Sequence, residues 1–219
     1  MKAGGTVLIT GAGRGLGAEL SRQYRAAGWD VVACARRPAA GEAALDLADD
    51  RSIAALAASL AGRPIDVLIH NAAIRGDTGG LATLDQAEFL AVIHVNAFAP
   101  LALTAALLPN LLAGRARKIA HISSRVGSMT EGMDDDGDYA YRMSKAALNL
   151  ATVKLAHDYR RQGITALALH PGWIRTDMGG PDAETGIGES AAGLIAVIEG
   201  ATLADSGSFR DFRGRTVAW

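Results

Sequence analysis

The stretch Thr10-Gly-Ala-Gly-Arg-Gly-Leu-Gly17 decides the fold, because it joins an apolar, β-branched segment to a segment with the pattern of a helix. Glycines at a strand-to-helix turn let the backbone approach a pyrophosphate closely, and the helix N-terminus adds free N–H groups and partial positive charge. The spacing is Gly11-x-x-x-Gly15-x-Gly17, a wider turn than Gly-x-Gly-x-x-Gly. A plain tight turn is the alternative, but the position between a first strand and a helix favours nucleotide binding.

Short β-branched segments alternate with alanine- and leucine-rich segments along the rest of the chain. A segment such as 67–70 is apolar on both faces, which is typical of a buried parallel strand. The alternation indicates the α/β class, with a single doubly wound parallel sheet of the Rossmann type and helices on both faces. No repeat or linker is visible, so we predict one domain over residues 1–219. The expected strands are 6–10, 30–35, 67–70, 118–123 and 165–170, and the expected helices are 15–27, 50–61, 84–112, 138–161 and 189–198.

Composition narrows the class of protein further. The chain has 219 residues, 49% of them hydrophobic, and a net charge of -1 without a basic cluster, which argues against nucleic-acid binding. The single cysteine, Cys34, excludes an internal disulfide and favours the cytoplasm. The apolar run after Met1 is too short for a signal peptide, and the most apolar stretch, 97–113, is interrupted by Pro100 and Pro109. We therefore expect a protein without a membrane span.

A tyrosine and a lysine lie four residues apart in Tyr141-Arg-Met-Ser-Lys145, within an expected helix. Residues at this spacing share one helix face, so a phenol and an ammonium group are presented side by side. A free tyrosine has a pKa of about 10, and a fixed cation lowers that pKa by favouring the phenolate. The alternative is an ordinary surface pair, so the meaning of these residues depends on the rest of the chain.

Short motifs are spread over nearly the whole chain at characteristic intervals. They are Thr10–Gly17, Asn71-Ala-Ala73, Asn96, Ile122-Ser-Ser124 with Tyr141 and Lys145, and Pro171-Gly-Trp-Ile-Arg-Thr176. With these motifs, the chain resembles the short-chain dehydrogenase/reductase family. The subgroup of small C-factor-like and sniffer-like carbonyl reductases is the most similar, on Ile122–Ser128, Tyr141–Asn149 and Gly214–Trp219.

The expected chemistry is hydride transfer to a carbonyl, whose oxygen becomes negative and then needs a proton. Tyr141 is the natural donor, and Lys145 would lower its pKa and hold the ribose hydroxyls. Ser124, at the end of an expected strand, would hydrogen-bond the carbonyl oxygen. The adjacent Ser123 would point elsewhere, and the resemblance assigns catalysis to Ser124, for which a turn or cap serine is the alternative.

Asn96 is the fourth candidate for the catalytic set. Pro100 lacks the N–H group that would bond the Asn96 carbonyl, and its ring crowds that carbonyl. We therefore expect a kink that frees the carbonyl to hold a water beside Lys145, as the resemblance also implies. A bend that only shapes the helix is the alternative.

The dinucleotide is expected to be NADP(H), although NAD(H) stays possible. An NAD site has an acid at the end of the second strand, but here Ala35 stands in that place and Arg36 and Arg37 follow. Arg14 is a further nearby cation, and a solvated basic loop is the alternative. The resemblance also places Asp46 and Leu47 at the adenine, with a turn as the alternative for Asp46. The other expected cofactor contacts are Gly11, Gly13, Gly15, Leu16, Gly17, Asn71, Ala72, Ala73, Tyr141, Lys145, Pro171, Gly172, Ile174 and Thr176.

Three of these segments carry more specific expectations. Asn71 is interpreted as a brace for the central sheet, and Ala73 departs from the family's glycine without abolishing binding. Trp173 either faces the substrate or packs. The acidic loop 128–138 widens the spacing between Ser124 and Tyr141, and we interpret its aspartates as solvated, with a rim of the substrate pocket as the alternative. No metal site is expected, because neither this loop nor the histidines show ligand spacing.

The segment 97–109 is apolar on nearly every side, so one face should pack on the sheet. The other face either lies inside the monomer or meets a second subunit, and the resemblance implies a homodimer or homotetramer through this helix and the Tyr141 helix.

The leading hypothesis is an NADPH-dependent reductase of a small ketone, aldehyde or quinone. The rival is a dinucleotide-binding signalling protein of the C-factor-like type with little turnover.

Overall fold

The computed structural model describes residues 4–133 and 137–219. The strands are β1 (Thr6–Thr10), β2 (Asp30–Ala35), β3 (Ala43–Ala44), β4 (Val67–His70), β5 (Lys118–Ile122), β6 (Thr165–His170) and β7 (Ser208–Asp211). The α-helices are α1 (Gly15–Ala26), α2 (Asp50–Ser59), α3 (Gln86–Ile93), α4 (Ala99–Ala106), α5 (Leu108–Ala113), α6 (Tyr139–Asp158) and α7 (Ile187–Gly200). The expected strands and helices are present with ends that differ by a few residues, except for the expected helix 84–112, which is divided.

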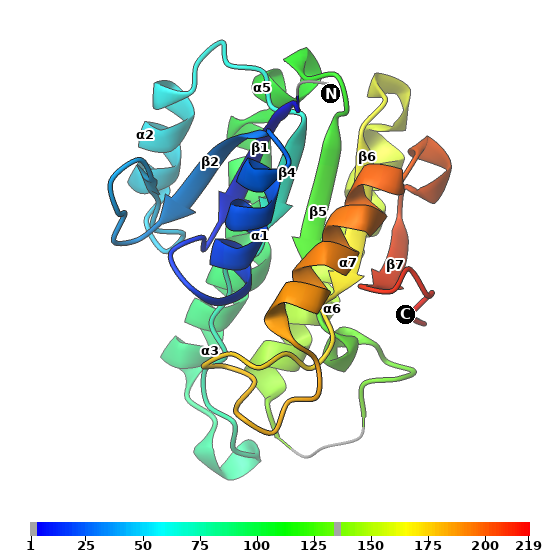
Figure 1. Ribbon diagram of the computed structural model, residues 1–219. Helices are drawn as coiled ribbons and strands as arrows, with labels where there is room; N and C mark the ends of the chain where they lie inside the picture. Colours follow the sequence, from blue (N-terminus) through cyan, green and yellow to red (C-terminus); the bar gives the residue numbers. More distant parts are fainter. Residues whose placement is uncertain (1–3, 134–136) are drawn as a thin grey trace.

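The strands form one parallel sheet in the order β3-β2-β1-β4-β5-β6-β7 within the described residues. From β1 the chain first builds outward through β2 and then returns to the other side of β1 at β4. The strand order therefore reverses between β1 and β4, where ligands bind in such sheets. Figure 1 shows α1 and α7 on one face and α2, α5 and α6 behind the sheet. The predicted fold class is confirmed.

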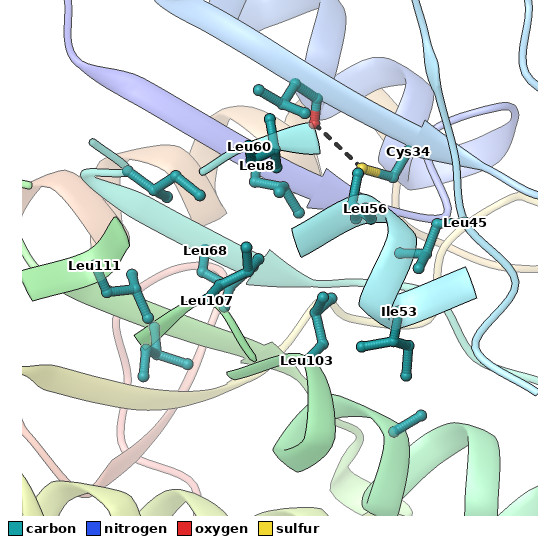
Figure 2. Close-up of a cluster of buried hydrophobic side chains, with 14 of the residues drawn as sticks. Leu8, Cys34, Leu45, Ile53, Leu56, Leu60, Leu68, Leu103, Leu107 and Leu111 are labelled. Atoms are coloured by element: carbon teal, nitrogen blue, oxygen red, sulfur yellow. Dashed lines mark hydrogen bonds between the residues drawn. The ribbon is translucent and has the colours of Figure 1, made fainter. Parts of the chain in front are cut away.

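Successive side chains of each strand point to opposite faces of the sheet, and helices cover both faces. Both sets of strand side chains are therefore buried. On one face, Leu8 and Leu68 pack with Leu103 of α4 and with leucines of α2 and α5 (Figure 2). On the other, Ile9 and Ile69 pack against α1 and α7. This two-sided burial explains the continuous apolar strands.

The expected helix 84–112 is the largest difference between prediction and structure, because it is divided into three helices and a π-helical turn, η2 (His94–Phe98). In η2 the N–H group of Ala99 bonds back to the His94 carbonyl, so the distortion precedes Pro100. Pro109 divides α4 from α5 because it lacks an N–H group to continue α4. The sequence predicts the first break through Pro100, and the second was missed.

Two strands lie outside the predicted set. β3 has two residues beside β2, and β7 pairs with β6 at the other edge. β3 is too short for a periodic pattern. In β7 the buried Phe209 and Asp211 alternate with more exposed positions, and the acidic member hides the pattern of a half-buried strand.

Residues 86–106 form a helical run that is long and apolar enough, by length and composition, to cross a membrane. In an apolar 18-residue window of this run, 44% of the residues are buried, and Ala99 and Leu103 are fully buried against the sheet. This burial is typical of a core helix, and such a run is weak evidence for a membrane span.

Candidate active site

The glycine-rich turn lies at the switch point between β1 and β4. Gly11 has a φ of 67°, in the left-handed region that favours glycine, and its Cα faces Ala72 after β4. A Cβ at Gly17 would lie 2.2 Å from the Gly11 carbonyl oxygen and 2.5 Å from Nδ2 of Asn71. The first turn of α1 can approach β1 this closely only without a side chain there. This cradle fits a pyrophosphate at the N-terminus of α1.

Asn71 fastens the ends of β1 and β4 together. Its Nδ2 donates to the carbonyls of Thr10 and Gly11, at 2.9 and 3.2 Å. The Thr10 hydroxyl oxygen in turn accepts from the backbone N–H groups of Asn71 and Ala72. These bonds match the interpretation of Asn71 as a brace. Ala73 follows directly and is half-buried.

The basic residues expected at the cofactor phosphate lie at the same edge of the sheet. Arg36 and Arg37 are exposed directly after β2, and Gly13 faces the Ala35 side chain, so the glycine-rich turn borders them. Arg14 forms an exposed ion pair with Asp177 in the loop after β6, and its contact with the cofactor stays a prediction. Leu16 is buried in the core beneath the turn.

Asp46 lies in a turn, the alternative left open by the sequence. Its carboxylate accepts from the Ala48 N–H group at 3.0 Å, and its own N–H group donates to the Ser52 hydroxyl. The side chain of Leu47 is buried in the core. Their contact with an adenine stays a prediction.

The adjacent serines after β5 have separate environments. Ser123 is buried, and its hydroxyl donates to Oδ1 of Asn149 on α6 at 2.6 Å. Ser124 is half-buried at the carboxyl end of the strand, where its hydroxyl oxygen accepts a long 3.4 Å bond from Val126 in the turn η3 (Arg125–Gly127). Ser123 therefore has a structural role, whereas Ser124 lies at the edge of the sheet formed by the carboxyl ends of the strands.

Lys145 and Tyr141 come from the first half of α6, which packs alongside β6 and η3. The ammonium group of Lys145 is buried, donates to the Ile122 carbonyl at 2.8 Å, and lies 5.5 Å from the centre of the Tyr141 ring. The structure thus brings Tyr141 and Lys145 together beside the end of β5, immediately before Ser124.

The expected direction of the Tyr141 pKa is wrong. Burial, opposed by the charge of Arg75 and reinforced by Asp138, raises the pKa of Tyr141 to about 12. Burial also lowers the pKa of Lys145 to about 8. The penalty for burying a phenolate exceeds the help from nearby cations. The phenol therefore stays protonated at neutral pH, as a proton donor requires.

Asn96 lies in η2 and joins three parts of the site. Its Oδ1 accepts from the Ile74 N–H group at 2.9 Å, and its Nδ2 donates to the Ile74 carbonyl and to the Ser144 hydroxyl. The side chain thus ties the loop after β4 to α6, beside Lys145. The helix is distorted before Pro100 as a π-helical turn, and the water held by the Asn96 carbonyl stays a prediction.

The loop after β6 closes the same edge. The Pro171 carbonyl accepts from Ser190 on α7, and Gly172, at a φ of 83°, lies against Phe212. Ile174 forms a bridge with Thr185, and the Thr176 hydroxyl oxygen accepts from the Gly179 N–H group. The indole of Trp173 is exposed but donates to the Gly179 carbonyl at 2.7 Å, so it holds this loop in shape.

Sequence reasoning missed an ion pair between Arg75 and Asp138. Asp138 is buried and pairs with Arg75 at 2.6 Å, which corrects its interpretation as a solvated residue of the acidic loop. The partners are 63 residues apart, so no local pattern indicates the pair. Asp134, Asp135 and Asp136 lie outside the described residues.

Two histidines of the central strands are buried side by side. His70 and His121 have ring centres 5.0 Å apart, and each bonds a threonine hydroxyl, of Thr104 and Thr152. Burial lowers the pKa of both, that of His121 to about 3 with help from the charge of Lys145. They are neutral structural residues at physiological pH. Over residues 4–133 and 137–219, no group of three or more potential metal ligands is assembled.

Comparison with known proteins agrees with this geometry. The sequence profile of the family described as short chain dehydrogenase matches residues 5–186. The chain therefore belongs to the short-chain dehydrogenase family, as predicted, and its class is that of an NAD(P)-dependent oxidoreductase.

Particular relatives place the chain within the family. C-signal of Myxococcus xanthus is 44% identical over 165 residues, covering 75% of this chain and 99% of that protein. The NADPH-bound carbonyl reductase from chicken fatty liver superposes with a TM-score of 0.91 at 32% identity, covering 98% of each chain. The carbonyl reductase Sniffer of D. melanogaster has a TM-score of 0.91 at 29% identity, covering 98% of this chain and 99% of its own. The predicted resemblance to C-factor-like and sniffer-like proteins is confirmed.

Proposed function

We propose that this protein is an NADPH-dependent reductase of a small-molecule ketone, aldehyde or quinone. The observation that carries the proposal is the position of Tyr141, with the Lys145 ammonium 5.5 Å from its ring centre, beside the strand end that presents Ser124. Bound NADPH supplies the hydride. Ser124 donates a hydrogen bond to the carbonyl oxygen, and Tyr141 transfers its proton there as negative charge builds up.

Several features support NADP(H) as the preferred cofactor. Ala35 leaves no carboxylate at the end of β2, and the exposed Arg36 and Arg37 follow at the edge that borders the glycine-rich turn. The chicken carbonyl reductase is a relative with NADPH bound. The role of Lys145 is to hold the ribose hydroxyls while its charge favours the developing phenolate.

Replacing Arg36 by aspartate is expected to reduce the preference for NADPH over NADH by about 10- to 100-fold. The change removes a charge-assisted contact and places a carboxylate near the 2′-phosphate. The ratio of kcat/KM values for the two cofactors measures it. Arg161→Asp, which alters an exposed arginine in the turn before β6, is the control and should leave the ratio unchanged. Equal use of both cofactors by the unaltered protein would contradict the assignment.

The test of the proposed function is NADPH consumption over a panel of aldehydes, ketones and quinones, with NADPH binding measured in parallel by fluorescence. Turnover of at least one carbonyl class is expected. Binding of NADPH without turnover on any compound would refute the reductase assignment.

That negative outcome would support a second candidate, a dinucleotide-binding signalling protein. The similarity to C-signal over nearly all of that protein's length favours this candidate. The presence of Asn96, Ser124, Tyr141 and Lys145 together argues for retained chemistry, because a role in binding alone has no need of the phenol.

We also propose a cytoplasmic homodimer or homotetramer assembled through α4 and α6. Phe98 and Leu101 are exposed on the η2–α4 side, and Met143, Leu150 and Val153 are exposed on α6. Phe98 and Leu101 belong to the segment that the sequence left either inside the monomer or at an interface, and the exposed α6 side chains lie on the second helix of the expected interface. Their exposure in a single chain supports the interface.

Leu150→Arg is expected to convert the assembly to a single chain, because a charge would be buried in the proposed apolar interface. Leu150 is 69% exposed, and Leu81, 71% exposed and outside α4 and α6, offers a matched control as Leu81→Arg. Gel filtration or light scattering measures the mass. A mass near 22.6 kDa for the unaltered protein would contradict the proposed assembly.

A further inference from the structure

The Arg75–Asp138 ion pair is a two-point contact. Nη2 of Arg75 lies 2.6 Å from Oδ2 of Asp138, and Nε lies 3.1 Å from Oδ1. Paired bonds between a guanidinium and a carboxylate fix the relative orientation of the two groups. The Asp138 side chain is 11% exposed and that of Arg75 is 45% exposed, so solvent screens the pair only in part.

Asp138 directly precedes α6, three residues before Tyr141. An aspartate at this position usually accepts a hydrogen bond from an N–H group of the first helical turn. Here the Asp138 side chain makes no capping bond, and its backbone lies in the left-handed region at φ 54°. Its carbonyl still accepts from Arg142, which begins the helix. The carboxylate therefore binds Arg75 and does not cap the end of the helix.

The loop that carries Arg75 is fastened to the start of α6 at two further points. The Asn96 side chain binds both backbone groups of Ile74 and also the Ser144 hydroxyl. A Cβ at Gly137 would lie 2.3 Å from the Thr78 carbonyl oxygen, so the two backbones are in contact. The loop after β4 and the first turn of α6 therefore behave as one unit around Tyr141.

We propose that Arg75 and Asp138 are positioning residues for Tyr141, holding residues 74–80 against the start of α6 and setting the balance of charge around the phenol. The proposal rests on the proposed role of Tyr141 as the proton donor. The two charges act in opposite directions: Arg75 lowers the pKa of Tyr141 and Asp138 raises it, on top of the larger effect of burial. Lys145, 5.5 Å from the ring centre, is a further charged group beside the phenol.

The test uses Asp138→Asn and Arg75→Leu, which should move the Tyr141 titration in opposite directions. With the carboxylate removed, the charge of Arg75 remains and the titration should move to lower pH by about one unit. With the guanidinium removed, the charge of Asp138 remains and the shift should be upward by a similar amount. In the double variant, the Tyr141 titration should lie near that of the unaltered protein. If the contact were merely structural, the Tyr141 titration would shift in the same direction in both single variants.

The titration is followed by tyrosinate absorbance as the difference between each variant and the same variant carrying Tyr141→Phe, with and without NADP⁺. Asp205→Asn and Arg210→Leu, which remove a remote ion pair of similar length, should leave the titration unchanged. Arg75→Lys keeps the positive charge, so the Tyr141 titration in this variant should lie near that of the unaltered protein. This variant still tests the proposal if Arg75→Leu fails to fold. Shifts in the same direction, no shift with Asp138→Asn, or a shift with Arg75→Lys as large as that with Arg75→Leu would each overturn the proposal.

This readout requires no turnover. An unaltered protein that reduces no carbonyl would refute the proposed function, while the direction of each titration shift would still decide the role of the ion pair. If turnover is present, the pH profile of kcat should move in the same direction as the phenol titration in each variant.

Discussion

Tyr141→Phe is expected to lower kcat/KM for carbonyl reduction by about 10³-fold, within the range found for the loss of a general acid. The phenol is held protonated by burial, with its pKa raised to about 12, and it is the group proposed to deliver a proton to the nascent alkoxide. Phenylalanine keeps the ring and its packing but cannot donate. NADPH binding, measured by fluorescence, should change little, so the loss should appear in the chemical step.

A neighbouring tyrosine supplies the control for this experiment. Tyr139 lies on the same helix two residues earlier, with its side chain exposed. Tyr139→Phe should leave kcat/KM unchanged, because that hydroxyl lies outside the proposed set of reacting groups. A Tyr141→Phe enzyme with a rate within about threefold of the original would refute the assignment of the proton donor.

Lys145→Met is expected to lower kcat/KM by about 10²-fold or more and, at the same time, to stabilise the fold. Burial lowers the pKa of Lys145 from the ordinary value of 10.5 to about 8. That difference corresponds to a cost of about 3 kcal/mol for keeping the ammonium charged in the folded protein at neutral pH. Methionine removes this cost but leaves the Ile122 carbonyl without its donor, which offsets about 1–2 kcal/mol. The net gain in free energy of unfolding should be about 1–2 kcal/mol.

The pH dependence of this gain follows from the direction of the Lys145 pKa. Because the folded protein binds the proton more weakly than the unfolded chain, charged Lys145 destabilises the fold fully below pH 8. The penalty is relieved as the pH rises from about 8 towards 10.5. Urea unfolding of both proteins at pH 7 and pH 10 should therefore show a larger difference at pH 7.

The control for this stability experiment is Lys154→Met. Lys154 is an exposed lysine of the same helix whose ammonium pairs with Asp158 at the surface. Its replacement should change the free energy of unfolding by less than about 0.5 kcal/mol. A Lys145→Met protein that is less stable than the original at pH 7 would show that the buried ammonium does not destabilise the fold.

Local signals were sufficient for most of the fold. The glycine-rich turn, the apolar strands and the alternation of strand and helix depend on neighbours in the chain, and the structure has them where the sequence predicts them. The helix that carries Tyr141 and Lys145 was predictable for the same reason. The brief strand β3 and the break at Pro109 were missed, because a two-residue strand has no period and an apolar run conceals a helix end.

The details of the site depended on contacts between distant residues. Arg14 pairs with Asp177, and Arg75 with Asp138, across separations of 163 and 63 residues. The direction of the Tyr141 pKa was also beyond sequence reasoning, because it depends on how deeply the phenol is buried.

By itself, the sequence determined the fold class, the glycine-rich turn that is proposed to bind phosphate and the identities of the residues in the proposed reaction. These features depend on spacing along the chain and on the geometry of glycine, helix and strand. The tertiary structure alone decided the partners of Arg14 and Asp138, the structural commitment of Ser123 and the protonated state of Tyr141. The physical reason is that desolvation and charge balance are set by everything packed around a group, and most of those neighbours are far away in the sequence.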